Sequence, residues 1–145
     1  MIKNVNQISE QAFLLDFGDE VTREINQNVI NTFNFISKKM QKNNPLGLKN
    51  CVPSYNKLLI HFNPSKNFLN GIERLQTESS VNIDEVEIPV CYDEEFALDI
   101  KDVSKKTKIN EDLIINSHLS TQFFVYMIGF MPGLPFMGDL ETNLN

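Results

Sequence analysis

Apolar runs in the first half of the chain predict the strands of an antiparallel sheet. Such runs occupy residues 12–17, 48–52 and 57–62, and residues 2–6 are placed to pair with the first of them. The turn-forming residues 53–56 join two of the runs into a predicted hairpin.

A long helix is predicted between the first run and this hairpin, from Asp19 as its N-cap to Lys42. Apolar residues recur every three or four positions and define one face of the helix: Val21, Ile25, Val29, Phe33, Ile36 and Met40. Polar residues define the opposite face: Arg23, Asn26, Gln27, Asn34 and Lys38. Asn26 is therefore expected on the side of the helix turned away from the sheet.

A second helix is predicted from residue 64 or 65 to 76, and it completes a domain over residues 1–82. Its apolar face consists of Phe68, Leu69, Ile72 and Leu75. The order strand, strand, helix, strand, strand, helix predicts an α+β two-layer sandwich with both helices on one face of the sheet. The polar residues 77–82 are the expected linker.

Residues 83–145 are the expected second domain. Its predicted elements are a strand at 86–90, helices at 97–107 and 111–119, and a strand at 123–128. Asn110 is the expected N-cap of the second of these helices. Residues 129–138 are predicted to be a loop because of their Gly and Pro content.

This last segment is unusually apolar for a loop. It contains Phe130, Met131, Leu134, Phe136 and Met137 among its glycines and prolines. Exposed apolar surface is costly in water, so either another element covers the segment or it is a recognition surface.

Charge and composition limit the function classes. The net charge is -6, with 41% hydrophobic and 22% charged residues, which is typical of a globular protein and disfavours nucleic acid and anionic membrane as partners. Residues 100–114 have the spacing of a helix-turn-helix motif. In a DNA-binding motif of this kind, however, the negative charges of Glu111 and Asp112 would repel the DNA phosphates. A pair of helices packed on a sheet is the better interpretation of that segment.

We expect a cytoplasmic protein. The chain has no apolar run long enough to cross a bilayer and no signal peptide at its beginning. Its two cysteines, Cys51 and Cys91, are expected to be buried, reduced thiols.

Candidate catalytic residues are few. No Gly-rich phosphate loop and no nucleophile elbow occur, and the acidic neighbours at 84–85 and 93–95 are typical of solvated turns, so no metal site is expected. His61 is interpreted as structural or surface. His118 is either a helix-end residue favoured by the helix dipole or a site residue preceding the apolar strand and loop.

Four segments together resemble one known family. They are 12–20, 52–64, 88–99 and, most specific, 125–138 with His118 before it. This combination is similar to the family of KipI and the B subunit of bacterial 5-oxoprolinase (PxpB), also called allophanate hydrolase subunit 1 or carboxyltransferase subdomain C and D.

The resemblance implies an N-terminal α+β domain and a C-terminal cyclophilin-like β-barrel beginning near Val86. Family members continue beyond the position of Asn145, so the chain is expected to stop inside the barrel. A barrel lacking strands leaves open edges, which predicts aggregation, pairing with another chain or a rearranged second half.

The resemblance also implies three alternative functions. The first is a non-autonomous 5-oxoprolinase component, PxpB, that works with the A and C components to hydrolyse 5-oxo-L-proline to L-glutamate, with ATP used at the level of the complex. The second is a KipI-like protein-binding module that inhibits a sensor histidine kinase. The third is a subunit of allophanate hydrolase or urea carboxylase type.

By the same resemblance, the functional surface is placed on residues around the apolar segment. His118 is the implied proton donor or acceptor and Tyr126 the implied hydrogen-bonding hydroxyl. The implied substrate- or partner-binding residues are Gly129, Phe130, Pro132, Gly133 and Pro135. Packing of the barrel and of a subunit interface is the alternative role for these residues.

Overall fold

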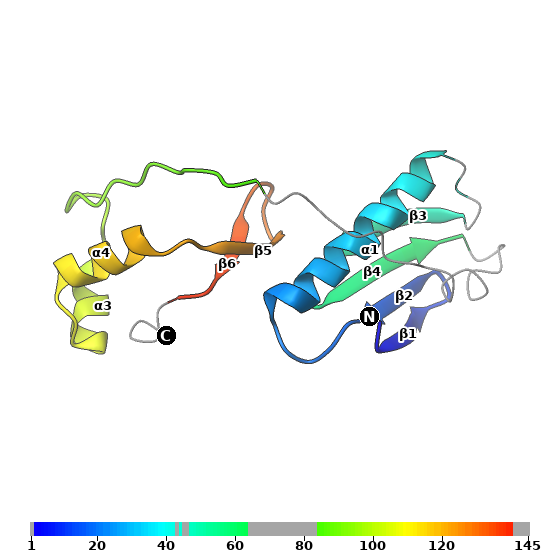
Figure 1. Ribbon diagram of the computed structural model, residues 1–145, viewed down its shortest axis with the longest axis horizontal. Helices are drawn as coiled ribbons and strands as arrows, with labels where there is room; N and C mark the ends of the chain where they lie inside the picture. Colours follow the sequence, from blue (N-terminus) through cyan, green and yellow to red (C-terminus); the bar gives the residue numbers. More distant parts are fainter. Residues whose placement is uncertain (1, 43, 45–46, 64–83, 141–145) are drawn as a thin grey trace.

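The computed structural model of the protein describes residues 2–42, 44, 47–63 and 84–140. Its first part is a four-stranded antiparallel sheet with the strand order β1-β2-β4-β3 (Figure 1). The strands are β1 (Asn4–Ser9), β2 (Ala12–Asp16), β3 (Leu48–Pro53) and β4 (Lys57–Phe62). These positions confirm the predicted strand pairs and the hairpin between β3 and β4.

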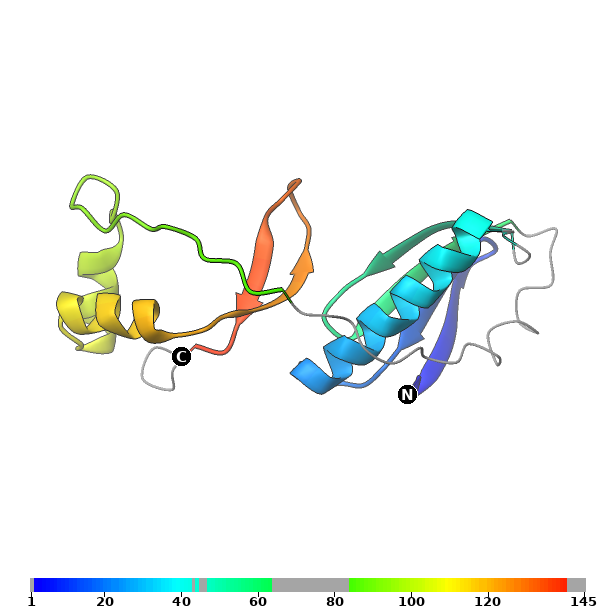
Figure 2. The same cartoon turned by 45° about the horizontal axis from the view of Figure 1, so that its top comes forward.

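Helix α1 (Arg23–Lys42) lies across one face of this sheet and closes the core (Figures 1 and 2). Alternate residues of the central strands point towards the helix, and Leu15, Leu58 and Ile60 are fully buried. Val29 and Ile36 meet them from α1, as the apolar periodicity predicts. The N-terminal part is thus a two-layer α+β unit.

The start of α1 and its polar face differ from the prediction. The helix begins at Arg23, where Thr22 Oγ1 accepts a hydrogen bond from the Ile25 amide at 3.2 Å, so Thr22 and not Asp19 is the N-cap. Val21 lies outside the helix and is exposed. Asn26 is buried at 1% exposure because its amide binds backbone carbonyls of other elements.

The predicted second helix and the linker lie outside the described residues, and so does the predicted domain boundary between residues 82 and 83. The chain is described again from residue 84 onwards. There it forms α3 (Ile100–Thr107), α4 (Glu111–Ser120), β5 (Phe124–Ile128) and β6 (Pro135–Gly138). Asn110 caps α4 as predicted, because its side chain accepts the Asp112 amide at 2.8 Å.

Two predictions for this part are wrong. Residues 86–90 form no strand, because a strand needs a ladder partner and no described residue pairs with them. The predicted loop at 129–138 ends in strand β6, which pairs with β5 in a two-stranded antiparallel sheet. Pro135 is tolerated there because it stands at the first position of the strand.

Helices α3 and α4 contact each other and stand away from the four-stranded sheet (Figures 1 and 2). No residue of α3 is buried, and Ile114 is the buried residue of α4. The pair is therefore not packed on the sheet face, contrary to the prediction. None of the described helices combines the length and the apolar character required to cross a bilayer.

The two cysteines differ in environment. Cys51 is buried in the core, and burial raises the pKa of its thiol to about 12, which makes it unreactive. Cys91 is exposed, contrary to the prediction, because the segment around it does not join a sheet.

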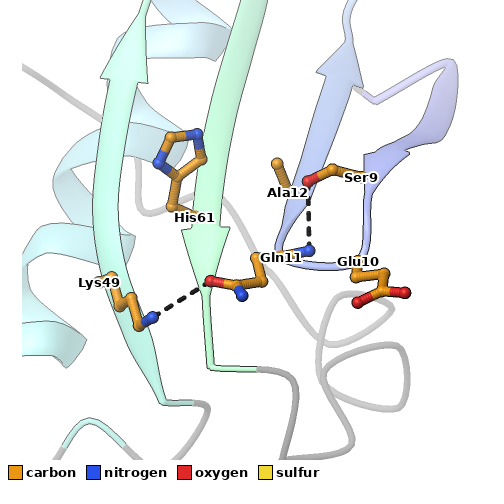
Figure 3. Close-up of a pocket in the computed structure, with 6 residues that line it drawn as sticks. All are labelled: Ser9, Glu10, Gln11, Ala12, Lys49 and His61. Atoms are coloured by element: carbon orange, nitrogen blue, oxygen red, sulfur yellow. Dashed lines mark hydrogen bonds between the residues drawn. The ribbon is translucent and has the colours of Figure 1, made fainter.

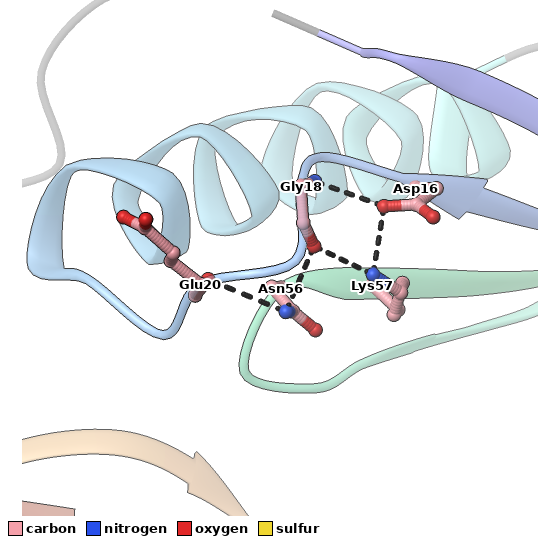
Figure 4. A network of polar contacts seen from close by, with 5 residues as sticks. All are labelled: Asp16, Gly18, Glu20, Asn56 and Lys57. Carbon is pink, nitrogen blue, oxygen red and sulfur yellow. Dashed lines mark hydrogen bonds and ion pairs between the residues drawn. The ribbon is translucent and has the colours of Figure 1, made fainter.

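A polar network fixes the connection from β2 to α1 (Figure 4). Lys57 Nζ donates to Asp16 Oδ1 at 2.7 Å and to the Gly18 carbonyl at 2.6 Å. Asn56 Nδ2 donates to the carbonyls of Gly18 at 2.9 Å and Glu20 at 3.3 Å. The β3–β4 turn therefore holds the segment that leads into the helix.

This network predicts a pH-dependent part of the stability. The hydrogen bond from Lys57 holds the pKa of Asp16 below its ordinary value. The pair therefore stabilises the folded chain above the unfolded pKa of about 3.9, and this contribution is lost as the pH falls through the lower folded pKa. In Lys57→Met we expect the free energy of unfolding at neutral pH to fall by about 1–2 kcal/mol.

Denaturant unfolding at several pH values measures both effects. The loss of stability between about pH 5 and pH 2 should be shallower in Lys57→Met than in the natural sequence. Lys49→Met is the matched control, because Lys49 Nζ makes an exposed hydrogen bond to Gln11 at 3.3 Å. The prediction would be contradicted if the free energy of unfolding of Lys57→Met fell as steeply towards acid pH as that of the natural sequence.

Candidate functional site

The β5–β6 hairpin carries most of the predicted site residues, and Tyr126 is its buried centre. Val125 pairs with Met137 and Met127 with Phe136, so the register shifts at Tyr126. Such a β-bulge changes the direction in which the extra side chain, here that of Tyr126, points. The Tyr126 ring lies against Gly138, where a Cβ would stand 2.7 Å from Tyr126 Cε2. Position 138 must therefore be glycine for Tyr126 to occupy this place.

The tip of the hairpin presents Phe130 to solvent. Backbone hydrogen bonds close the tip, from the Gly129 amide to the Leu134 carbonyl at 3.1 Å and from the Met131 amide to the Gly129 carbonyl at 2.7 Å. Phe130 has φ +64° and is 91% exposed. A bulky residue with positive φ is rare and strained. Phe130 therefore stands on the outside of the tip, where a partner could reach it.

The other predicted residues of this segment shape the tip. Pro132 precedes Gly133, whose φ of +83° favours glycine even though no neighbour would obstruct a Cβ there. Pro135 begins β6 opposite Ile128. The turn between β5 and β6 thus contains Gly129, Phe130, Pro132 and Gly133, and Pro135 follows it as the first residue of β6.

Hydrogen bonds from Asn26 connect this hairpin to the N-terminal unit. Its Nδ2 donates to the Tyr126 carbonyl at 2.9 Å, the Tyr55 carbonyl at 2.9 Å and the Ser54 carbonyl at 3.4 Å. Helix α1, the β3–β4 turn and β5 therefore meet at one amide group. The Tyr55 ring adds contacts to Tyr126, with centroids 5.9 Å apart, and edge-on to Phe136, with centroids 6.2 Å apart.

A second link joins the start of α1 to the end of β6. Arg23 binds Asp139 Oδ2 at 2.6 Å and stacks its guanidinium over the Phe124 ring at 5.3 Å. The Tyr126 hydroxyl donates to Asp139 Oδ1 at 3.1 Å. Burial, and then the bond to Asp139, raise the pKa of the Tyr126 phenol. The Tyr126 phenol is therefore neutral, and its hydroxyl donates a hydrogen bond to the Asp139 carboxylate.

His118 lies in a separate cluster in the last turn of α4. Its Nδ1 is hydrogen-bonded to the Tyr92 hydroxyl, and the two rings meet edge-on with centroids 5.8 Å apart. The Phe123 ring packs on the imidazole at 4.9 Å. No described contact joins His118 to Tyr126, so the structure does not bring the two predicted catalytic residues into one site.

A surface hollow lies beside the turn that joins β1 and β2 (Figure 3). It measures about 440 Å³, and its lining residues are Ser9, Glu10, Gln11, Ala12, Lys49 and His61. Lys49 bonds Gln11 across it, and His61 projects from β4 on its exposed side. None of the predicted site residues lines this hollow. Within the described ranges, no group of three or more His, Cys, Asp or Glu side chains is placed to hold a metal ion.

Comparison with known families identifies the family of the chain. The family model of the carboxyltransferase domain, subdomain C and D, matches residues 3–145. The chain belongs to this family. The match confirms the resemblance that segments 12–20, 52–64, 88–99 and 125–138 indicate.

The curated relatives include three proteins named as the B subunit of 5-oxoprolinase. That of Bacillus subtilis (strain 168) is 26% identical over 158 aligned positions, which cover 97% of this chain and 64% of that protein. That of Haemophilus influenzae is 33% identical and covers 69% of this chain and 46% of that protein. That of Escherichia coli O157:H7 is 31% identical, with 66% and 47% covered. The chain thus spans about half to two thirds of these relatives.

Solved structures show the same fold. A crystal structure of the protein TTHA0988 superposes with a TM-score of 0.75 at 28% identity, over 92% of this chain and 27% of that one. A second crystal form gives a TM-score of 0.72 at 29% identity. The α+β class is therefore shared with solved proteins.

Sequence reasoning missed three residues of the junction. Helical periodicity places Asn26 on the polar face of its helix, and Arg23 and Asp139 lie 116 positions apart. One signal for Asn26 is its place one residue after apolar Ile25, at the border of the apolar face. No local pattern indicates the carbonyls that it binds.

We expect Asn26→Leu to release the hairpin from the sheet. The substitution keeps the branched shape of the side chain but removes the donor shared by the three carbonyls, so the free energy of unfolding should fall by about 2 kcal/mol or more. Hydrogen exchange of the β5 and β6 amides should accelerate more than that of the β2 and β4 amides.

Asn28→Leu is the matched control on the same helix, because Asn28 Nδ2 donates within α1, to the Glu24 carbonyl at 3.1 Å. Equal exchange rates in the hairpin of Asn26→Leu and of the control would refute the anchoring role of Asn26.

Proposed function

We propose that this chain is part of the B component, PxpB, of a 5-oxoprolinase that converts 5-oxo-L-proline to L-glutamate with ATP. The observation that carries the proposal is the similarity to relatives named as that component, one of which is matched over 97% of this chain. The proposed site of action is the cytoplasm. Because the chain spans only part of those relatives, the activity is assigned to the complex and not to this chain alone.

The proposed partners are the A and C components of the 5-oxoprolinase, and ATP is bound at the level of the complex. The amide bond of a five-membered lactam is unreactive, and coupling to ATP activates its carbonyl. The described part of the chain offers no phosphate-binding loop, so the nucleotide is proposed to bind mainly to other subunits. Residues 83–145 are proposed to contribute to a cyclophilin-like barrel.

Of the two proposed catalytic residues, His118 is the better candidate for proton transfer. It is only partly buried, and among the described residues no hydrogen bond engages its Nε2. Tyr126 is 5% exposed and its hydroxyl is bound to Asp139. Tyr126 is therefore proposed to hold the hairpin in place, with His118 available to a substrate or to a neighbouring subunit.

The direct test is reconstitution. The chain is mixed with its cognate A and C components, and glutamate release from 5-oxoproline is followed with and without ATP. We expect ATP-dependent glutamate only when all three components are present. A parallel sample contains a version of the chain extended to the length of the Bacillus subtilis relative. Absence of glutamate with both versions, in the presence of active A and C components, would reject the proposal.

One observation favours the second function, a protein-binding module that inhibits a sensor histidine kinase. The hairpin exposes several apolar side chains at and beside its tip, namely Ile128, Phe130, Met131 and Leu134. Apolar anchors on a backbone fixed by hydrogen bonds suit a partner protein with a complementary groove. An autophosphorylation assay with the chain at equal stoichiometry separates this function from the first.

The tip predicts a specific effect on association. We expect Phe130→Ser to weaken binding to the C component of the 5-oxoprolinase by about tenfold or more, because an exposed aromatic anchor loses its apolar contact area. Isothermal titration calorimetry measures the affinity. Phe96→Ser is the control, because Phe96 is also exposed, at 63%, but lies before α3. Equal affinities for both variants would count against the tip as the contact surface.

A further inference from the structure

The Tyr92–His118 pair links two segments that the sequence does not relate. Tyr92 follows the extended residues 84–91, and His118 lies in the last turn of α4. The hydroxyl of Tyr92 is hydrogen-bonded to Nδ1 of His118 and not to Nε2. The pair is partly buried, so the hydrogen bond is shielded from competing water.

The ring contacts fix the plane of the imidazole. Tyr92 meets it edge-on at an interplanar angle of 75°, and Phe123 lies against it at 4.9 Å with an angle of 43°. Phe123 directly precedes β5. The imidazole is therefore held between a residue of the extended segment and a residue next to the hairpin strand, and its orientation does not depend on α4 alone.

The hydrogen bond determines which nitrogen carries the proton in the neutral imidazole. The positions of the two atoms allow either one to donate. A phenol O–H is a stronger acid than the N–H of a neutral imidazole, so the favoured arrangement is the one in which the Tyr92 hydroxyl donates and Nδ1 accepts. The single N–H of the neutral ring must then be on Nε2. A hydrogen bond at one ring nitrogen is the general means by which proteins set the role of the other.

We propose that Tyr92 is a positioning residue that holds His118 in its Nε2–H tautomer, with Nε2–H directed away from Tyr92 as a donor. The group that receives this donor is a carbonyl or carboxylate oxygen. The lactam carbonyl of the substrate is such a group, and this last step rests on the proposed function. The tautomer itself does not depend on the reaction.

The tautomer is read directly by nitrogen NMR. The chain has two histidines, His61 and His118, so imidazole ¹⁵N labelling gives two sets of signals, and the exposed His61 of β4 serves as the internal reference. Long-range proton–nitrogen spectra are recorded above the titration range of an ordinary imidazole, about pH 6.5. His118 should show an unprotonated Nδ1 and a protonated Nε2 without averaging.

Tyr92→Phe removes only the hydroxyl and retains the ring contact. We expect the two nitrogen signals of His118 to move towards each other, which is the signature of a tautomer mixture, while those of His61 stay unchanged. Tyr55→Phe is the matched control, because Tyr55 contacts Tyr126 and Phe136 and, within the described part of the chain, no contact joins it to a histidine. A His118 with Nδ1 protonated, or unchanged signals in Tyr92→Phe, would overturn the inference.

The reconstituted complex adds a second readout. In an active complex we expect Tyr92→Phe to lower kcat by about tenfold with little change in KM, a part of the roughly 100-fold or more that one hydrogen-bond donor to a developing oxyanion supplies. An inactive complex with the natural sequence rejects the proposed function, whereas the nitrogen spectra still decide the role of Tyr92. Normal turnover in Tyr92→Phe together with a shifted tautomer would reject the link to catalysis.

Discussion

The buried amide of Asn26 is the constraint on which the arrangement of the two parts depends. A carboxamide that is almost completely removed from water is tolerated only when its polar atoms find partners. Here the partners of Nδ2 are carbonyls of Ser54, Tyr55 and Tyr126, which belong to a turn of the sheet and to the hairpin. If the hairpin moved away, this amide and the Tyr126 carbonyl would lose their mutual bond, and the cost of an unsatisfied buried group would oppose the movement.

This constraint matters because the hairpin has little stability of its own. A two-stranded sheet is marginally stable in water. The Arg23–Asp139 ion pair is partly exposed, with side-chain exposures of 55% and 36%, and pairs of that kind contribute little. The buried Asn26 bonds and the ring contacts of Tyr55 with Tyr126 and Phe136 therefore provide most of the attachment. The tip with Phe130 projects from this anchored base.

Much of the N-terminal unit could be predicted from local pattern, because alternation and helical periodicity report directly which side chains enter a core. The strands around Leu15 and Leu58 and the helix around Val29 follow this rule. The same rule failed at Asn26, because periodicity classifies residues by polarity and cannot reveal a buried polar group with distant partners. It also failed at residues 86–90, where the alternation of a strand is present but no described strand pairs with it. At residues 129–138 the Gly and Pro content indicated a loop, although the last part of this segment forms β6.

The candidate site could be predicted only as a set of residues, not as a geometry. The family resemblance places His118 and Tyr126 on one functional surface, yet the two side chains have different surroundings: Tyr126 is engaged by Asp139 at the junction, and His118 by Tyr92 and Phe123. A buried phenol with a raised pKa gives up its proton less readily, so it is poorly suited to act as an acid or a base near neutral pH. Phe123 and Phe124 are adjacent in sequence, and they contact the His118 cluster and the Arg23–Tyr126 cluster respectively. The chain at the start of β5 therefore joins the two clusters: the residue that packs on the imidazole is followed directly by the residue that packs on Tyr126 and Arg23.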